Sequence, residues 1–209
     1  MGLFQGNIGQ IISRLTWELP QTLLGYASSG FSNWGGDVEN VNYYDGATVV
    51  THKSGGWGAF TLGSYINGDS SIRADPYNSL FQHEYGHYLQ SQKFGLLYLG
   101  KFAIPSIING MSVSPKDHHL FGAEQDANSR AYSYFSSHVQ NYNANQSDWD
   151  SYNNPINGYD FSKSIGDSSN QLALSGALNN LKWYDIPLFV GTGMVGSGFI
   201  QSFIQPKKK

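Results

Sequence analysis

The first part of the chain has apolar residues at helical spacing. These residues are Ile8, Ile11, Ile12 and Leu15. Side chains three and four positions apart lie on one face of a helix, so this run predicts helical structure. Pro20 breaks or restarts the helix because it lacks a backbone N–H, and Leu23 and Leu24 continue the apolar pattern after it. We therefore predict a partly helical segment over residues 8–31.

The pattern then changes to strand-like runs. Asp45-Gly46 separates two runs rich in Val, Tyr and Thr, and Asp-Gly in that position is a strong hairpin signal. A further run from Trp57 to Ile66 predicts a third strand, which ends at Asn67. A hairpin followed by one more strand predicts a small mixed or antiparallel sheet.

Two more helices are predicted after the strands. Asp75-Pro76 near the start and Gly95 after the end are typical boundaries, and they predict a helix that runs to about Gln92. Apolar residues near one face predict another helix over residues 120–139. The order helix, hairpin, strand, helix, helix indicates the α+β class.

The length of 209 residues suits a single domain, residues 1–209. Residues 140–170 are rich in Asn, Ser, Asp and Tyr, and we predict a long irregular segment there. Residues 186–206 form an uncharged, Gly-rich apolar run that is long enough to span a bilayer. Pro187, its glycines and its polar residues favour a packed C-terminal segment, with membrane insertion as the alternative.

The composition excludes several classes of protein. The net charge is −3, so a basic nucleic-acid-binding surface is excluded. The chain has no cysteine, which excludes disulfide scaffolds, thiolate zinc sites and cysteine nucleophiles. The first residues show no basic segment followed by an apolar run, so no signal peptide is visible. If the protein is exported, we therefore expect it to be the C-terminal part of a larger protein.

The sequence His83-Glu84-Tyr85-Gly86-His87 is an H-E-x-x-H motif inside a predicted helix. Residues i and i+4 project from the same helix face, so two imidazoles there can bind one zinc ion. Glu84 lies beside the metal, where it can take a proton from zinc-bound water as general base. Zinc lowers the pKa of that water to about 7, which makes hydroxide available at neutral pH.

A catalytic zinc ion needs a third protein ligand. Met-turn enzymes have a histidine six residues after the motif, but Lys93 is at that position here. Glu124 on the next predicted helix is the preferred third ligand, and Asn128 lies one turn later on the same face. Asn128 could accept the ring N–H of a ligand histidine and fix its tautomer. The rivals to Glu124 as ligand are Asp126, His118 and His119.

A hydrolase of this kind also needs a donor that stabilises the oxyanion. His118 and His119 precede the Glu124 helix and are candidates for this role or for substrate contact. Tyr159 and Tyr184 are alternatives that the sequence does not rank. The G-x-G-x-x-G run at residues 191–196 is too close to the last residue for a dinucleotide fold, so zinc is the only predicted cofactor.

The paired motifs H-E-x-G-H and E-x-x-A-[DN] resemble those of gluzincins, especially minimal zinc peptidases whose second motif is Glu-x-x-Ala-Asp. This chain has Asn128 where those enzymes have Asp. Residues 13–140 also resemble the C-terminal region of RHS-repeat proteins from Bacteroidetes-type bacteria. Among the stretches that carry this likeness are WELPQT from Trp17 and NSLFQHEYGHYLQSQ from Asn78. The resemblance implies a zincin-like fold and a toxin or effector domain that is secreted or displayed on the bacterial surface.

We therefore predict a zinc-dependent hydrolase of the metallopeptidase class, with a polypeptide substrate. An extended peptide would lie along the strand near Ala59–Gly63, just before the motif helix. An immunity protein is a candidate partner, and neither nucleic acid nor a membrane is an expected partner. The alternatives are a non-catalytic zinc-binding or recognition domain at the tip of an RHS-type surface protein, and a membrane-acting toxin that uses residues 186–206.

Overall fold

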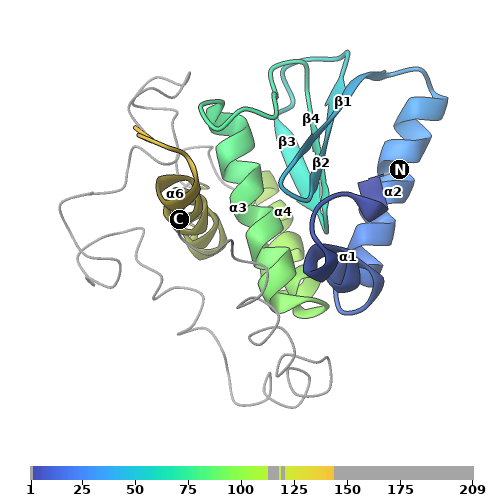
Figure 1. The fold of residues 1–209 in the computed structure, drawn as a ribbon. Coiled ribbons are helices and arrows are strands. Elements are labelled where there is room, and N and C mark those ends of the chain that lie inside the picture. Colours follow the sequence, from blue (N-terminus) through green and yellow to red (C-terminus); the bar gives the residue numbers. More distant parts are fainter. Residues whose placement is uncertain (1, 113–117, 119–120, 144–209) are drawn as a thin grey trace.

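The computed structural model describes residues 2–112, 118 and 121–143. The described residues form a mixed α+β fold in which helices lie on both faces of a small four-stranded sheet (Figure 1). The strands are β1 (Val38–Tyr44), β2 (Ala47–His52), β3 (Ala59–Leu62) and β4 (Tyr65–Gly68). The α-helices are α1 (Ile8–Leu15), α2 (Leu19–Trp34), α3 (Ser79–Phe94), α4 (Ile104–Ser112) and α6 (Gly122–His138). The predicted α+β class is confirmed.

The sheet is mixed, with the strand order β1-β2-β4-β3. β1 and β2 form the predicted antiparallel hairpin, in which Tyr44 pairs with Ala47 across Asp45-Gly46. β2 and β4 are parallel, whereas β4 and β3 are antiparallel. This order makes β3 an edge strand of the sheet.

The prediction of one strand from Trp57 to Ile66 is wrong. The run is a second hairpin, in which β3 and β4 pair through Leu62 and Tyr65. The chain reverses at Gly63, whose φ is +60°, a conformation that glycine adopts without steric strain. A side chain at this position would also collide with Thr22 of α2, because a Cβ atom would lie 2.3 Å from the Thr22 hydroxyl oxygen.

The predicted start of the motif helix at Asp75-Pro76 is also wrong. The helix begins at Ser79, and the side chain of Asn78 accepts a hydrogen bond from the backbone N–H of Phe81. Asparagine is a favourable N-cap because its side-chain oxygen satisfies a free N–H of the first turn. Asp75 instead holds the preceding turn, where its backbone carbonyl accepts from Asn78 N–H. The end is close to the prediction, since α3 ends at Phe94 and Gly95 follows as its C-cap.

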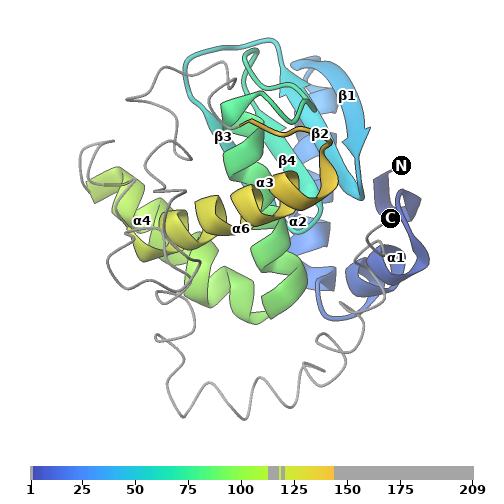
Figure 2. The same ribbon diagram turned by 60° about the vertical axis from the view of Figure 1, so that its left-hand side comes forward.

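Helix α3 lies between the sheet and α6 (Figures 1 and 2). Its inner side packs on an aromatic core that includes Phe81, Tyr85 and Phe135 together with Val49 and Ile66 of the sheet. The other face of the sheet is covered by α2, whose Tyr26 packs edge-on against Tyr65. The motif helix is thus fixed on both sides by packed elements.

Several predictions concern residues outside the described part of the chain. The irregular segment 140–170 is described only as far as residue 143, and the Gly-rich segment 186–206 lies wholly outside it. His119, Tyr159 and Tyr184 are also outside it. Among the described helices, none has the length and apolar character needed to cross a bilayer.

Candidate metal centre

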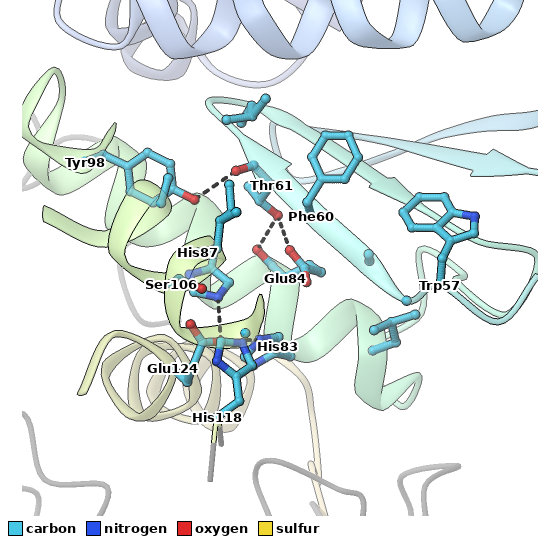
Figure 3. Close-up of a pocket in the computed structure, with 17 residues that line it drawn as sticks. Trp57, Phe60, Thr61, His83, Glu84, His87, Tyr98, Ser106, His118 and Glu124 are labelled. Atoms are coloured by element: carbon cyan, nitrogen blue, oxygen red, sulfur yellow. Dashed lines mark hydrogen bonds and ion pairs between the residues drawn. The ribbon is translucent and has the colours of Figure 1, made fainter. Parts of the chain in front are cut away.

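Three predicted ligands meet between α3 and α6. His83 and His87 project from successive turns of α3, and their Nε2 atoms lie 3.0 and 3.2 Å from Oε2 of Glu124 on α6. The three ligand atoms lie within 4.8 Å of one another, so this group could hold a metal ion. Figure 3 shows His83, His87 and Glu124 close together among the residues that line a cavity.

The other nitrogen of each imidazole is held by an amide side chain. Nδ1 of His83 lies 2.7 Å from Oδ1 of Asn128, and Nδ1 of His87 lies 2.8 Å from Oε1 of Gln90. When Nδ1 donates to an amide oxygen, the proton is on Nδ1 and the lone pair of Nε2 is free for a metal. Both rings are therefore oriented with Nε2 toward Glu124.

Gln90 is fixed in turn by two acceptors. Its Nε2 donates to the backbone carbonyl of Ala123 and to Oδ2 of Asp126, each at 2.8 Å. Asp126 also forms an ion pair with Arg130 at 2.7 Å. Asp126, a rival candidate for the third ligand, thus contacts Gln90 and Arg130 and is not part of the ligand group.

The electrostatics of the group favour a bound cation. Glu124 is 1% exposed, and its Oε1 has no hydrogen-bond partner in the described structure. Burial raises the pKa of Glu124, but the two imidazoles outweigh burial and hold that pKa well below its usual range. Burial lowers the pKa of His87, but the Glu124 carboxylate outweighs it and raises this pKa to about 9. A metal ion would replace the protons shared in this cluster.

Glu84 lies on α3 beside the ligand group and is held by the edge strand. The hydroxyl of Thr61 on β3 donates to Oε2 of Glu84 at 2.7 Å and lies 3.1 Å from the backbone carbonyl of Glu84 (Figure 3). Glu84 is buried, and this hydrogen bond restricts its side chain to one orientation. The second carboxylate oxygen is left for another partner.

A cavity of about 460 Å³ opens between β3, α3 and α4, and the ligand group lies in its wall. Its other walls are mainly apolar and include Trp57, Phe60, Leu80 and Ile107. Apolar walls around a few convergent polar groups are typical of a site that binds a small molecule or a short segment of chain.

His118 lies at the same cavity, where its Nε2 is 3.7 Å from Oε2 of Glu124. Its Nδ1 is 2.9 Å from Oδ1 of Asn109 on α4. The distance to Glu124 is longer than those of His83 and His87, so His118 is beside the ligand group and outside its closest contacts. An N–H at Nε2 would point into the cavity.

Sequence reasoning missed three residues of the site. Gln90 is three positions after His87 on the same helix, and this spacing could have identified it. Thr61 and Tyr98 come from other elements, and Tyr98 donates a hydrogen bond from its hydroxyl to the backbone carbonyl of Thr61 at 2.8 Å. No local pattern in the sequence links either residue to the motif.

Comparisons of this chain with protein-family models, with curated proteins and with solved structures find no match. The site is therefore interpreted from its own residues.

Proposed function

We propose that the protein is a zinc-dependent hydrolase with a zincin-like site, and that its substrate is a polypeptide. The observation that carries this proposal is the convergence of both Nε2 atoms on Oε2 of Glu124, with Glu84 buried beside them. Two histidines and one glutamate are a ligand set that zinc hydrolases use.

The residues present fit a zinc ion. His83, His87 and Glu124 would hold it, and Asn128 and Gln90 would fix the two rings. Oε1 of Glu124, which is buried and has no hydrogen-bond partner among the described residues, is available to a cation. Zinc, when bound at such a site, lowers the pKa of water to about 7 and polarises a carbonyl group.

Glu84 is the proposed general base. Its carboxylate takes a proton from the attacking water and then returns it to the leaving amine. The Thr61 hydroxyl holds one oxygen of the carboxylate, which leaves the other oxygen for the water. His118 is the proposed oxyanion donor; because Asn109 accepts from Nδ1, this role requires the doubly protonated ring, whose Nε2 N–H would donate at the cavity.

The edge of β3 supports a peptide substrate. On the β4 side, the backbone carbonyl of Gly58 accepts a hydrogen bond from the N–H of Asp69. The backbone N–H and C=O groups of successive residues in a strand point to alternate sides, so those of Ala59 point to the open side. The carbonyl of Thr61 is occupied by Tyr98, which ends the open edge there. A peptide could thus pair with β3 through Ala59, a shorter stretch than the predicted Ala59–Gly63.

The resemblance to RHS-repeat proteins favours a toxin or effector domain carried by a larger exported protein of a bacterium. In that setting the domain would be secreted or displayed on the cell surface, and an immunity protein would protect the producing cell. This part of the proposal rests on the resemblance alone.

Metal analysis and a peptide-library digest test the proposed function together. We expect one zinc ion per chain and cleavage of peptides by the wild type, with no cleavage by Glu84→Gln loaded with the same amount of zinc. Glu39→Gln, which changes an exposed glutamate on β1, is the matched control. A zinc-loaded wild type that cleaves no peptide in a diverse library would contradict the proposed substrate.

A further inference from the structure

Helices α1 and α2 bury their polar sides and expose their apolar sides. On α1, Ile8, Ile12 and Leu15 are 77%, 42% and 46% exposed, whereas Gln10, Ser13 and Arg14 are buried. Apolar stripes of helices in soluble domains normally face the core. In α1 the apolar stripe instead faces away from the core.

The same reversal holds in α2. Leu24, Phe31 and Trp34 are 52%, 71% and 86% exposed, and their spacing places them on one stripe of the helix. The opposite side, which faces β3 and β4, carries Gln21, Thr22 and Ser29. We call the six exposed residues Ile8, Ile12, Leu15, Leu24, Phe31 and Trp34 the α1–α2 face.

Buried polar contacts fix this orientation. Arg14 is fully buried, and its guanidinium donates to the backbone carbonyls of Gly2 and Leu3 at 3.1 Å and also to that of Gly46. On α2, the hydroxyl of Ser29 hydrogen-bonds to Oδ1 of Asn67 on β4 at 2.9 Å. Rotating the helices to bury their apolar sides would break these bonds, so the α1–α2 face stays on the outside of the described structure.

The α1–α2 face has no charged side chain. Within residues 2–34 the charged residues are Arg14 and Glu18, and both are 0% exposed. An exposed apolar surface of this kind marks an interaction site. Helices that lie on membranes usually carry Lys and Arg on their polar side, and the absence of such residues favours an uncharged, apolar protein segment as the occupant.

The chain contains a segment of that chemistry. Residues 186–206 carry no charge, and they include Leu188, Phe189, Phe199 and Ile200 among their apolar side chains. The chain between residues 143 and 186 can extend to about 140 Å at ~3.3 Å per residue, so its length does not prevent contact with α1 and α2. A tethered segment also has a high effective concentration at its docking site.

We propose that residues 186–206 pack on the α1–α2 face. This contact would remove two uncharged apolar surfaces of the same chain from water. It would also leave the candidate metal centre open, because α2 covers the face of the sheet opposite to α3 (Figure 1). The proposal is independent of the hydrolase function.

The absence of cysteine in the chain makes a cross-linking test direct. The full-length double variant Leu24→Cys/Phe199→Cys is treated with a short thiol cross-linker, and the product is mapped by mass spectrometry. The matched control Glu39→Cys/Phe199→Cys places the first cysteine at an exposed site on β1. We expect an intramolecular cross-link in the first variant at a rate at least about 10-fold above the control.

A second measurement follows maleimide labelling of the single variant Leu24→Cys, alone and combined with Phe199→Asp/Ile200→Asp. We expect slow labelling in the first protein and labelling at the Glu39→Cys rate in the combined variant, because the charges would prevent docking. Equal labelling rates in the two Leu24→Cys proteins would overturn the proposal. A cross-link between two chains, together with a dimer in sedimentation, would also overturn it and would identify a second copy as the occupant. Protection of Leu24→Cys from labelling only by phosphatidylcholine vesicles would overturn it in favour of a membrane.

Discussion

The backbone of Gly86 lies directly against the backbone carbonyl of Ala127, where α3 crosses α6. A Cβ atom at Gly86 would lie 2.0 Å from this carbonyl oxygen. Gly86 is the fourth residue of the H-E-x-x-H motif, and Ala127 lies between Glu124 and Asn128 in sequence. This close approach brings the Glu124 carboxylate to the two imidazoles.

Gly86→Ala should therefore separate the two helices. We expect a loss of about 1–3 kcal/mol in unfolding free energy from overpacking, together with weaker zinc binding, since Glu124 moves away from the histidines. Denaturant unfolding and chelator competition measure the two effects. Gly122→Ala is the control, because no atom lies within 4 Å of a Cβ at that position. Unchanged stability and zinc affinity in Gly86→Ala would contradict the close contact.

His83→Ala should lose zinc. The variant removes one of the two imidazoles that face Oε2 of Glu124, and the remaining two side chains hold the metal weakly. Native mass spectrometry of the purified variant measures the zinc content. His138→Ala, at the end of α6, leaves the ligand group intact and should retain one zinc ion per chain. Full retention of zinc by His83→Ala would exclude this site.

Glu84→Gln should keep both the fold and the zinc but lose hydrolysis. General bases contribute about 10²–10⁴-fold to the rate, and an amide cannot accept the proton from water. The amide oxygen can still accept the hydrogen bond from Thr61, so the side chain should stay in place. Cleavage rates on a peptide found with the wild type measure the loss. Normal cleavage by the variant would show that another group acts as base.

The sequence predicted those parts of the site that lie on one helix face. His83 and His87 are four positions apart, and Glu124 and Asn128 repeat this spacing on the second helix. Thr61 reaches Glu84 from a strand, and only the tertiary fold brings the two together. The local pattern therefore identified the residues expected to bind the metal, while the residue that orients Glu84 stayed hidden.

The fold shows the same division between local and tertiary information. Asp45-Gly46 predicted one hairpin correctly, whereas Gly63-Ser64 reverses the chain inside a run that resembles one continuous strand. Helical spacing predicted α1, but spacing alone does not say which side is buried. The apolar side of α1 faces outward because the buried guanidinium of Arg14 donates to the backbone carbonyl of Gly46, between β1 and β2. On α2 the polar side faces the sheet, where Ser29 hydrogen-bonds to Asn67 of β4.

Asn128→Ala should weaken zinc binding without abolishing it. The variant removes the acceptor that holds Nδ1 of His83 at 2.7 Å, and changes at such outer partners cost about 10–100-fold in metal affinity or activity. Asn128→Asp keeps an acceptor oxygen and should retain most of the affinity. Competition with a chelator of known affinity compares the three proteins. Equal affinities in Asn128→Ala and the wild type would assign Asn128 to helix packing.

The last prediction concerns Glu18, a fully buried carboxyl group behind the motif helix. Its two oxygens accept hydrogen bonds from Ser13 at 2.5 Å and from Ser91 of α3 at 2.8 Å. Burial raises its pKa from 4.5 to about 7, although the two serine hydroxyls and the charge of Arg14 lower it in part. The folded protein should therefore hold a proton on Glu18 at pH values where the unfolded chain has lost it.

The sign of the pH dependence follows from this difference. The contribution of Glu18 to stability is fully present below pH 4.5, and it is lost as the pH rises through about 7. Glu18→Gln is neutral at every pH, so its unfolding free energy relative to the wild type should rise between pH 4.5 and pH 8. At 1.36 kcal/mol per pKa unit the rise should be about 3 kcal/mol. Urea unfolding of the metal-free proteins at both pH values measures it, with the exposed Glu39→Gln as control. If the difference in unfolding free energy between Glu18→Gln and the wild type is the same at both pH values, Glu18 does not titrate in this range.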